Sequence, residues 1–191
     1  THLRSGRTPE NKLALLTAIL ADGINLGLTR MADVSPGITM RQLAWAHDWH
    51  IREEGYTAAH AILVNAQRQL PLASLWGDGT TSSSDGQYFP AGGHAEAIGD
   101  LNGRYGPNPG AKFYRFTSDQ YGAFYIIAMN ANASEAIYVL DGLLYHGSDL
   151  AIETHYVDTG GVSDMSFALC HLVGFQIVPR LRGLKDRKLY L

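Results

Sequence analysis

The sequence predicts an α/β protein in which a helical region precedes a mixed β-sheet with helices on its faces. Apolar residues recur at steps of three and four over the first third of the chain, which is the period of an amphipathic helix. From residue 72 onwards, runs rich in aromatic and β-branched residues alternate with helical patterns. We therefore expect a helical linking region over residues 1–70 and an α/β domain over residues 71–191.

Three helices are expected in the first part. The first carries an apolar stripe on one face and ends at "SPG", residues 35–37. The residues of this stripe are Leu13, Leu16, Leu20, Ile24, Leu28 and Met31. Thr39 followed by Gln42 matches a capping box, which predicts the start of a second helix. A third amphipathic stretch covers residues 57–69 and ends before Pro71.

Strands and helices alternate in the second part. The runs 112–119 and 122–131 are joined by "SDQYG", which predicts a β-hairpin. Ser134 and Ser163 are candidate N-caps of two helices, and "AIETHYVD" and "FQIVP" are two further strands. With a first strand within residues 76–89, the order is strand, strand, strand, helix, strand, helix, strand. This order predicts a mixed sheet. Residues 90–111 are rich in glycine and proline, which predicts a long loop between the first and second strands.

Composition excludes several classes of protein. Of the 191 residues, 46% are hydrophobic and 17% charged, so the chain can bury a core and is not disordered by composition. The formal net charge of −3 and the pI of about 6.2 give no support for nucleic-acid binding through overall charge. The single cysteine, Cys170, excludes an internal disulfide. No apolar run reaches the ~18 residues of a membrane span, so no membrane partner is expected.

Serine and nucleotide chemistry find no support in the polar segment "WGDGTTSSSDGQYF". It contains neither the P-loop pattern G-x-x-x-x-G-K-[ST] nor the nucleophile pattern G-x-S-x-G. A nucleophile among Ser82, Ser83 and Ser84 would need a distant histidine such as His146 or His155, and the sequence does not pair them.

The histidines favour structural roles. His47 and His50 stand at i, i+3 on an expected helix and can ligate a metal, but a helix with two polar positions beside two tryptophans is the preferred explanation. His155 lies three residues before Asp158, which puts the two side chains on opposite faces of a strand. We therefore expect His155 to be a neighbour of Asp158 and not its catalytic partner.

Carboxylates at strand ends are the strongest chemical signal. Asp158 closes its strand just before two glycines, and Asp78 or Asp85 belongs to the first strand. Mg²⁺ prefers oxygen ligands, commonly one or two carboxylates together with phosphate oxygens. Asp78 and Asp85 are separated by an odd number of residues, so a regular strand would point them to opposite faces. We expect one of them at a metal site for phosphoryl transfer; the alternative is that Asp-Gly pairs only mark turns.

A local basic cluster offers contacts to DNA. The C-terminal "PRLRGLKDRKLYL" contains Arg180, Arg182, Lys185, Arg187 and Lys188. These cations can bind phosphates without reading sequence, and the alternative is a solvated surface segment. The hydroxyls of Ser82, Ser83 and Ser84 are further candidates for phosphate contacts.

Consecutive blocks of the chain resemble transposases of the Tn-three family, the large DDE enzymes of replicative, cointegrate-forming bacterial transposons. The blocks are "LLTAILADGINLGLTRMA", "LVNAQRQLPLASLWGDGTTSSSDGQYF", "KFYRFTSDQYG", "YVLDGLLYH", "HYVDTGGVSDMSFALCHLVGF" and "PRLRGLKDRKLY". The resemblance covers nearly the whole chain in order.

The resemblance implies a partial RNase H-like sheet and Mg²⁺-dependent chemistry, with Mn²⁺ as a substitute. In such enzymes water cleaves the transposon ends, and the exposed 3′-hydroxyls attack the target DNA. The implied partners are the terminal repeats of the transposon and the target DNA, together with further copies of the full-length protein. The implied location is the bacterial cytoplasm, in association with the nucleoid.

The resemblance also implies which acids are catalytic and bind the metal. The second is Asp158, and the spacing favours Asp85 as the first, although Asp78 directly follows the apolar "LASLW" and stays open. The third acid, a glutamate, is expected beyond Leu191, so the chain is expected to be an internal, catalytically incomplete fragment. Two other interpretations remain: a non-catalytic DNA-binding or assembly remnant, and an unrelated metal-dependent nuclease of the same fold.

Overall fold

Two compact units make up the computed structural model, Thr1–Ala59 and His60–Leu191. Helix α4 (Glu53–Arg68) contains the division between them. The domain boundary that the sequence places at residue 70 stays a prediction. The structure describes residues 2, 5–90, 102–161, 163–180, 182, 183 and 185.

The first unit is built from short helices around small buried side chains. Besides the start of α4, it contains helices α1 (Lys12–Gly23), α2 (Leu28–Val34) and α3 (Met40–His50). Its core combines three alanines of α1 with residues of α2 and α3; the main members are Ala14, Ala18, Ala21, Met31, Leu43 and Ala46. Because alanine has a very short side chain, α1 and α3 can approach each other closely.

The apolar stripe expected on the first helix differs from this core. Leu13, Leu16, Leu20 and Ile24 are exposed, whereas Met31 is buried in this core and Leu28 packs against it. The single expected helix is interrupted before α2. Asn25 and Gly27 adopt positive φ angles of 52° and 79°, which end α1 and turn the chain into α2. Periodicity therefore identified the helical segment correctly, and the packed face correctly in α2 but not in α1.

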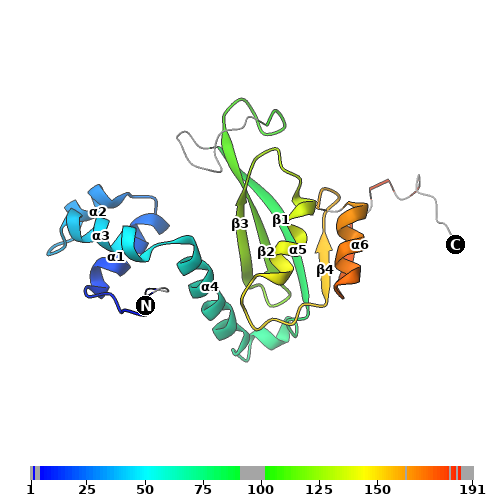
Figure 1. Ribbon diagram of the computed structural model, residues 1–191, viewed down its shortest axis with the longest axis horizontal. Helices are drawn as coiled ribbons and strands as arrows, with labels where there is room; N and C mark the ends of the chain where they lie inside the picture. The colour runs from blue at the N-terminus through cyan, green and yellow to red at the C-terminus, as the bar shows by residue number, and fades with distance from the viewer. Residues whose placement is uncertain are drawn as a thin grey trace. The chain divides into compact units, whose positions relative to one another are not determined.

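The second unit contains a five-stranded mixed sheet with the order β3-β2-β1-β4-β5 (Figure 1). β1 pairs antiparallel with β2 and β2 with β3, whereas β4 runs parallel to β1 and β5 parallel to β4. This is the arrangement of an RNase H-like sheet, and the predicted fold class is confirmed. The strands are β1 (Thr81–Pro90), β2 (Gly110–Ser118), β3 (Ala123–Met129), β4 (Thr154–Val157) and β5 (Gln176–Pro179).

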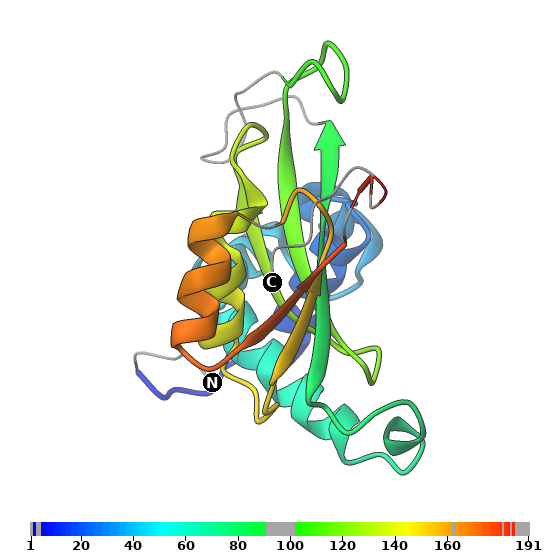
Figure 2. The same cartoon turned by 90° about the vertical axis from the view of Figure 1, so that its right-hand side faces the viewer.

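Helices α5 (Val139–Leu144) and α6 (Asp164–Leu172) lie together on one face of this sheet (Figure 2). Under them, Tyr114 and Phe116 of β2 are fully buried. Because side chains alternate along a strand, Arg115, which lies between them, points to the other face and is exposed. We call these the covered face and the open face of the sheet.

The helix starts follow the predicted caps at two of three places. Thr39 forms a capping box with Gln42, and Ser163 forms one with Ser166 at the start of α6. Ser134 makes no side-chain cap hydrogen bond, and the chain passes through a 3₁₀ turn, η2 (Glu135–Ile137), before α5 begins. A second 3₁₀ turn, η1 (Ala73–Leu75), precedes β1. Of the long loop predicted over residues 90–111, residues 91–101 lie outside the described part of the chain.

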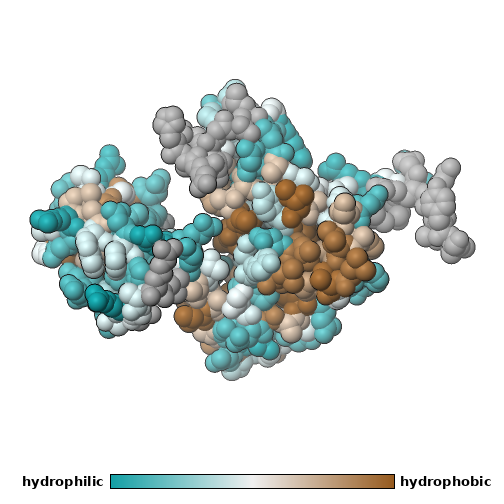
Figure 3. Space-filling model, in the orientation of Figure 1, coloured by the Kyte–Doolittle hydropathy of each residue, from teal (hydrophilic) through white to brown (hydrophobic). Residues whose placement is uncertain are grey.

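Apolar side chains gather on the surface over α5 and α6 (Figure 3). Ile137, Met165 and Leu172 are among the most exposed large hydrophobic residues there. None of the helices in the described part of the chain has the length and apolar character that a membrane span requires.

Candidate active site

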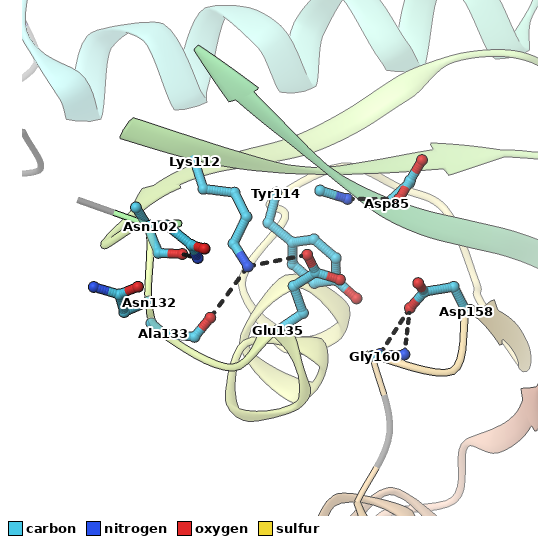
Figure 4. A network of polar contacts seen from close by, with 12 residues as sticks. Asp85, Asn102, Lys112, Tyr114, Asn132, Ala133, Glu135, Asp158 and Gly160 are labelled. Atoms are coloured by element: carbon cyan, nitrogen blue, oxygen red, sulfur yellow. Dashed lines mark hydrogen bonds and ion pairs between the residues drawn. The ribbon is translucent and has the colours of Figure 1, made fainter. Parts of the chain in front are cut away.

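Asp85 and Asp158 lie on neighbouring strands at the carboxyl end of β4 (Figure 4). In the parallel pair of β1 and β4, Ser84 lies opposite Val157, so the next residue of each strand is one of the two acids. Neighbouring strands are about 4.8 Å apart, so the backbones of the two aspartates lie side by side. Both aspartates are exposed. The register between two strands that are distant in sequence therefore creates this pair.

Asp158 is fixed by the glycines that follow it. Its Oδ1 accepts hydrogen bonds from the backbone N–H groups of Gly160 and Gly161, each 2.8 Å long. A Cβ at Gly161 would lie 3.0 Å from Cβ of Val157 and 3.2 Å from the hydroxyl of Tyr114. A larger residue at position 161 would therefore push the turn away and move the Asp158 carboxylate.

The pair offers carboxylate oxygens, the type of ligand that a hard divalent cation prefers. Oδ1 of Asp85 accepts a 2.8 Å hydrogen bond from the N–H of Gly86, as Oδ1 of Asp158 does from its own turn. Within the described residues, no hydrogen bond reaches Oδ2 of either aspartate and neither forms an ion pair. No cluster of three or more His, Cys, Asp or Glu side chains suited to a metal occurs among these residues. Two carboxylates with free oxygens fit Mg²⁺, which takes its remaining ligands from water and phosphate.

Asp78 lies away from this pair. It precedes β1 and accepts hydrogen bonds from the backbone N–H and the hydroxyl of Thr80, and these bonds lower its pKa. The stretch of β1 from Thr81 to Asp85 alone spans about 13 Å at about 3.3 Å per residue. Two ligands of one Mg²⁺ are at most about 4 Å apart, because each metal–oxygen bond is about 2.1 Å. In this structure Asp78 therefore cannot share a metal with Asp158.

The three serines of β1 divide between the two faces. Ser82 and Ser84 are 2% and 8% exposed and are hydrogen-bonded within the covered face. This corrects the predicted phosphate contacts, since buried and bonded hydroxyls are not accessible to DNA. Ser83 points to the open face and is exposed, two positions before Asp85.

The basic cluster begins beside the acids. The N–H of Arg180 donates to the carbonyl of Val157 (2.9 Å), directly before Asp158, and its own carbonyl accepts from Thr159. Arg182 and Lys185 are exposed. The predicted contacts through Arg187 and Lys188 fall outside the described residues.

Tyr114 is a residue of this region that the sequence did not single out. Its hydroxyl lies 2.6 Å from Oγ of Ser84, directly before Asp85 in β1. Burial raises the pKa of Tyr114 well above its ordinary value, and the carboxylates of Glu135, Asp158 and Asp85 raise it further. The phenol therefore stays protonated among three acids (Figure 4).

A buried ion pair adjoins the same region. Nζ of Lys112 lies 3.2 Å from Oε1 of Glu135 and donates to the carbonyl of Ala133. A Cβ at Gly86 would collide with the Glu135 carboxylate, so this pair lies against β1 next to Asp85. The signal in the sequence was the alternation of "KFYRF", which puts Lys112 on the same face as two buried aromatic residues.

In the part of the first unit that the structure describes, the histidines belong to no group of three or more side chains suited to a metal. Nε2 of His47 lies 3.3 Å from Asp22, and its Nδ1 lies 3.4 Å from Asp48. His50 lies among aromatic rings, 5.8 Å from Trp45. This agrees with the structural role preferred for both.

The chain matches one protein family over its whole length. The profile of the family described as Tn3 transposase DDE domain covers residues 1–191. The chain is 54% identical over 191 residues to the transposase of transposon Tn501 from Pseudomonas aeruginosa and 46% identical over 192 residues to that of Tn1546 from Enterococcus faecium. Each match covers 100% of this chain and 19% of the relative, so the chain spans about a fifth of their length.

Solved transposase structures resemble the chain more distantly. A piggyBac transposase synaptic complex with hairpin DNA matches with a TM-score of 0.44 and 12% identity, over 94% of this chain and 43% of that one. A Mos1 transposase paired-end complex matches with a TM-score of 0.36 and 11% identity, over 92% and 60%. The match of the family profile and the close relatives decide the assignment: the chain belongs to the family of the Tn3 transposase DDE domain.

Proposed function

We propose that this chain supplies the first part of the catalytic core of a DDE-type DNA transposase. The activity is cleavage of transposon ends and transfer of the strands into target DNA. The observation that supports it best is the juxtaposition of Asp85 and Asp158 on neighbouring parallel strands. A remnant whose aspartates only mark turns would not need both carboxylates side by side with an unbonded oxygen each.

Asp85 and Asp158 are the proposed metal-binding residues, through their Oδ2 oxygens. When bound, Mg²⁺, or Mn²⁺ in its place, would stabilise the attacking and the leaving oxygen of an in-line phosphoryl transfer. The two Oδ1 atoms hold the carboxylates in place, because each accepts backbone N–H groups of its own turn. Asp78 has no part in the proposed site.

DNA is the proposed partner, both as transposon ends and as target. Ser83 and Arg115 on the open face, and Arg180, Arg182 and Lys185 after β5, are the described residues that can contact phosphates. Arg187 and Lys188 continue the same basic segment in sequence. Self-association of the full-length protein and action at the bacterial nucleoid are part of this proposal.

Metal binding tests the site directly. Mn²⁺ titrations followed by electron paramagnetic resonance should show one class of site that Asp85→Asn and Asp158→Asn each weaken at least tenfold. Asp78→Asn is the matched control, because it removes the same charge and should leave the affinity unchanged. Loss of affinity in Asp78→Asn, or no loss in the other two, would contradict the assignment.

Activity is tested in a full-length relative. The corresponding segment of the Tn501 transposase is replaced by this chain, and 3′-end cleavage and strand transfer are measured on transposon-end DNA. Asp85→Asn and Asp158→Asn should abolish both steps, and Asp78→Asn should retain them. If the unmutated chimera binds end DNA but the aspartate variants cleave normally, the chain is a binding module and not part of a catalytic core.

A further inference from the structure

A continuous chain of side-chain hydrogen bonds lies behind the two aspartates, on the covered face of the sheet. Nδ1 of His155 lies 2.8 Å from Oγ of Ser82, and its Nε2 lies 2.8 Å from Oγ of Ser84. Ser84 continues the chain to the hydroxyl of Tyr114 at 2.6 Å. The imidazole of His155 in β4 thus bridges two hydroxyls of β1, and the hydroxyl of Ser84 also bonds to Tyr114 in β2.

The bridge is buried, and its ring packs against an aromatic neighbour. His155 is 0% exposed, and its ring stacks on Phe116 at 5.3 Å with 22° between the planes. Burial lowers the pKa of His155 to about 4, so the ring is neutral at neutral pH. A neutral imidazole has one N–H donor and one acceptor nitrogen, and hydroxyls on both sides can satisfy both.

This bridge can form in only one register of β4 against β1. Ser82 and Ser84 lie on the same face two residues apart, and His155 lies opposite Ser82. A slip of one residue would put the imidazole opposite side chains of the other face. A slip of two residues would leave at least one buried nitrogen without a partner, which is strongly unfavourable.

The same register sets the spacing of the two acids. Asp85 directly follows Ser84, and Asp158 is three residues after His155. Each residue of slip would move one carboxylate relative to the other by about 3.3 Å along the strands. That displacement is close to the whole distance of about 4 Å that two ligands of one ion can span, given metal–oxygen bonds of about 2.1 Å.

We propose that His155, bridging Ser82 and Ser84, is the positioning group of the aspartate pair. It fixes β4 against β1 and thereby holds Asp85 and Asp158 at the separation that a divalent cation needs. The inference rests on the proposed function, since it assigns a role to the metal site formed by these acids. His155 acts through the strands and touches neither substrate nor metal.

The decisive comparison separates the hydrogen bonds from the packing. His155→Phe keeps an aromatic ring over Phe116 but leaves two buried hydroxyls without their nitrogen partner. The triple variant Ser82→Ala, Ser84→Ala, His155→Phe also removes those hydroxyls and leaves only the buried Tyr114 hydroxyl without its Ser84 partner, so it should restore part of the stability. Thr154→Val is the matched control: it removes a hydroxyl from the same strand but on the opposite face.

Two quantities are measured for each variant: the Mn²⁺ dissociation constant and the midpoint of unfolding in urea. We expect His155→Phe to lower the midpoint and weaken Mn²⁺ binding at least tenfold, in the range usual for residues that orient metal ligands. The triple variant should recover part of the lost midpoint but keep the weak Mn²⁺ binding. Thr154→Val should bind Mn²⁺ as the unmutated chain does.

Each contrary outcome has its own meaning. If the triple variant recovers both stability and Mn²⁺ affinity, the bridge contributes only to stability and the inference is overturned. If the triple variant does not fold, Ser82→Ala decides: it removes one anchor and should still weaken Mn²⁺ binding, and unchanged affinity overturns the inference. If the unmutated chain binds no Mn²⁺ through Asp85 and Asp158, the proposed metal site itself fails, and this inference fails with it.

Discussion

Breaking the buried pair of Lys112 and Glu135 should destabilise the second unit strongly, and replacing both residues should reverse most of the loss. Lys112 is 7% exposed, and its ammonium is 3.2 Å from the Glu135 carboxylate. Glu135→Gln keeps the shape of the side chain but leaves the ammonium without its counter-charge. Lys112→Met leaves the carboxylate alone instead.

The magnitude follows from the burial and from the remaining partner. Removing one member of a buried ion pair costs about 3–5 kcal/mol, because the other charge stays desolvated. Glu135→Gln should lie at the lower end, about 3 kcal/mol, since Lys112 keeps its hydrogen bond to the carbonyl of Ala133. Lys112→Met should cost more, because that carbonyl also loses its donor. The double variant has no unpaired charge and should lie well below the sum of the two single losses.

A double-mutant cycle in urea measures this difference. Circular dichroism and tryptophan fluorescence give the free energy of unfolding for the unmutated chain, the two single variants and the double variant. We expect a coupling of at least about 2 kcal/mol between the two substitutions. Additivity within about 0.5 kcal/mol would show that Lys112 and Glu135 do not depend on each other, and the account of this region as an ion pair against β1 would then be refuted.

Three further predictions concern packing, protonation and capping. Gly142→Ala should destabilise by about 1–3 kcal/mol in thermal unfolding, because a Cβ would enter the buried ring of Phe116 and overpacking outweighs the gain of about 1 kcal/mol in helix propensity. The pKa of His155 is about 4 in the folded chain and about 6.5 in the unfolded chain. The free energy of unfolding should therefore be unaffected by this group above about pH 6.5 and should fall by about 3 kcal/mol as the pH drops to about 4, because only the unfolded chain takes up the proton. Urea titrations at several pH values should show a weaker dependence of this free energy on pH in His155→Phe. Ser163→Ala should cost about 1 kcal/mol through the lost N-cap of α6, whereas Ser134→Ala, at a position without a cap hydrogen bond, should change the urea midpoint very little.

The sequence predicted the sheet well because its strands carry local signals. "KFYRF" alternates strictly, so the burial of Tyr114 and Phe116 and the exposure of Arg115 follow from a period of two. The hairpin after it needs only a short turn, and the strand, helix, strand order beyond it restricts β4 and β5 to parallel pairing. Each of these conclusions depends on residues that are close in sequence.

The remaining features depend on contacts between distant residues. Nothing local distinguishes the leucine face of α1 from its alanine face as the packed one, because that depends on how closely α3 can approach. The partner of Lys112 is Glu135, which reaches it only through the turn after β3. Likewise, the odd separation of Asp78 and Asp85 in sequence predicts that only one of them can lie beside Asp158. The pairing of β1 with β4 is needed to decide which one does.

The two faces of β1 carry different side chains, so substitutions on the two faces should have different effects. Ser83 and Asp85 point to the open face, whereas Ser82 and Ser84 point under the helices to His155. If the proposed function holds, a change on the covered face does not remove a DNA contact, yet it can move Asp85 because the same backbone carries both. Conversely, replacing an open-face residue removes a contact but leaves the register intact. Substitutions on the covered face should therefore weaken metal binding and DNA cleavage together, and those on the open face other than the aspartates should affect DNA affinity alone.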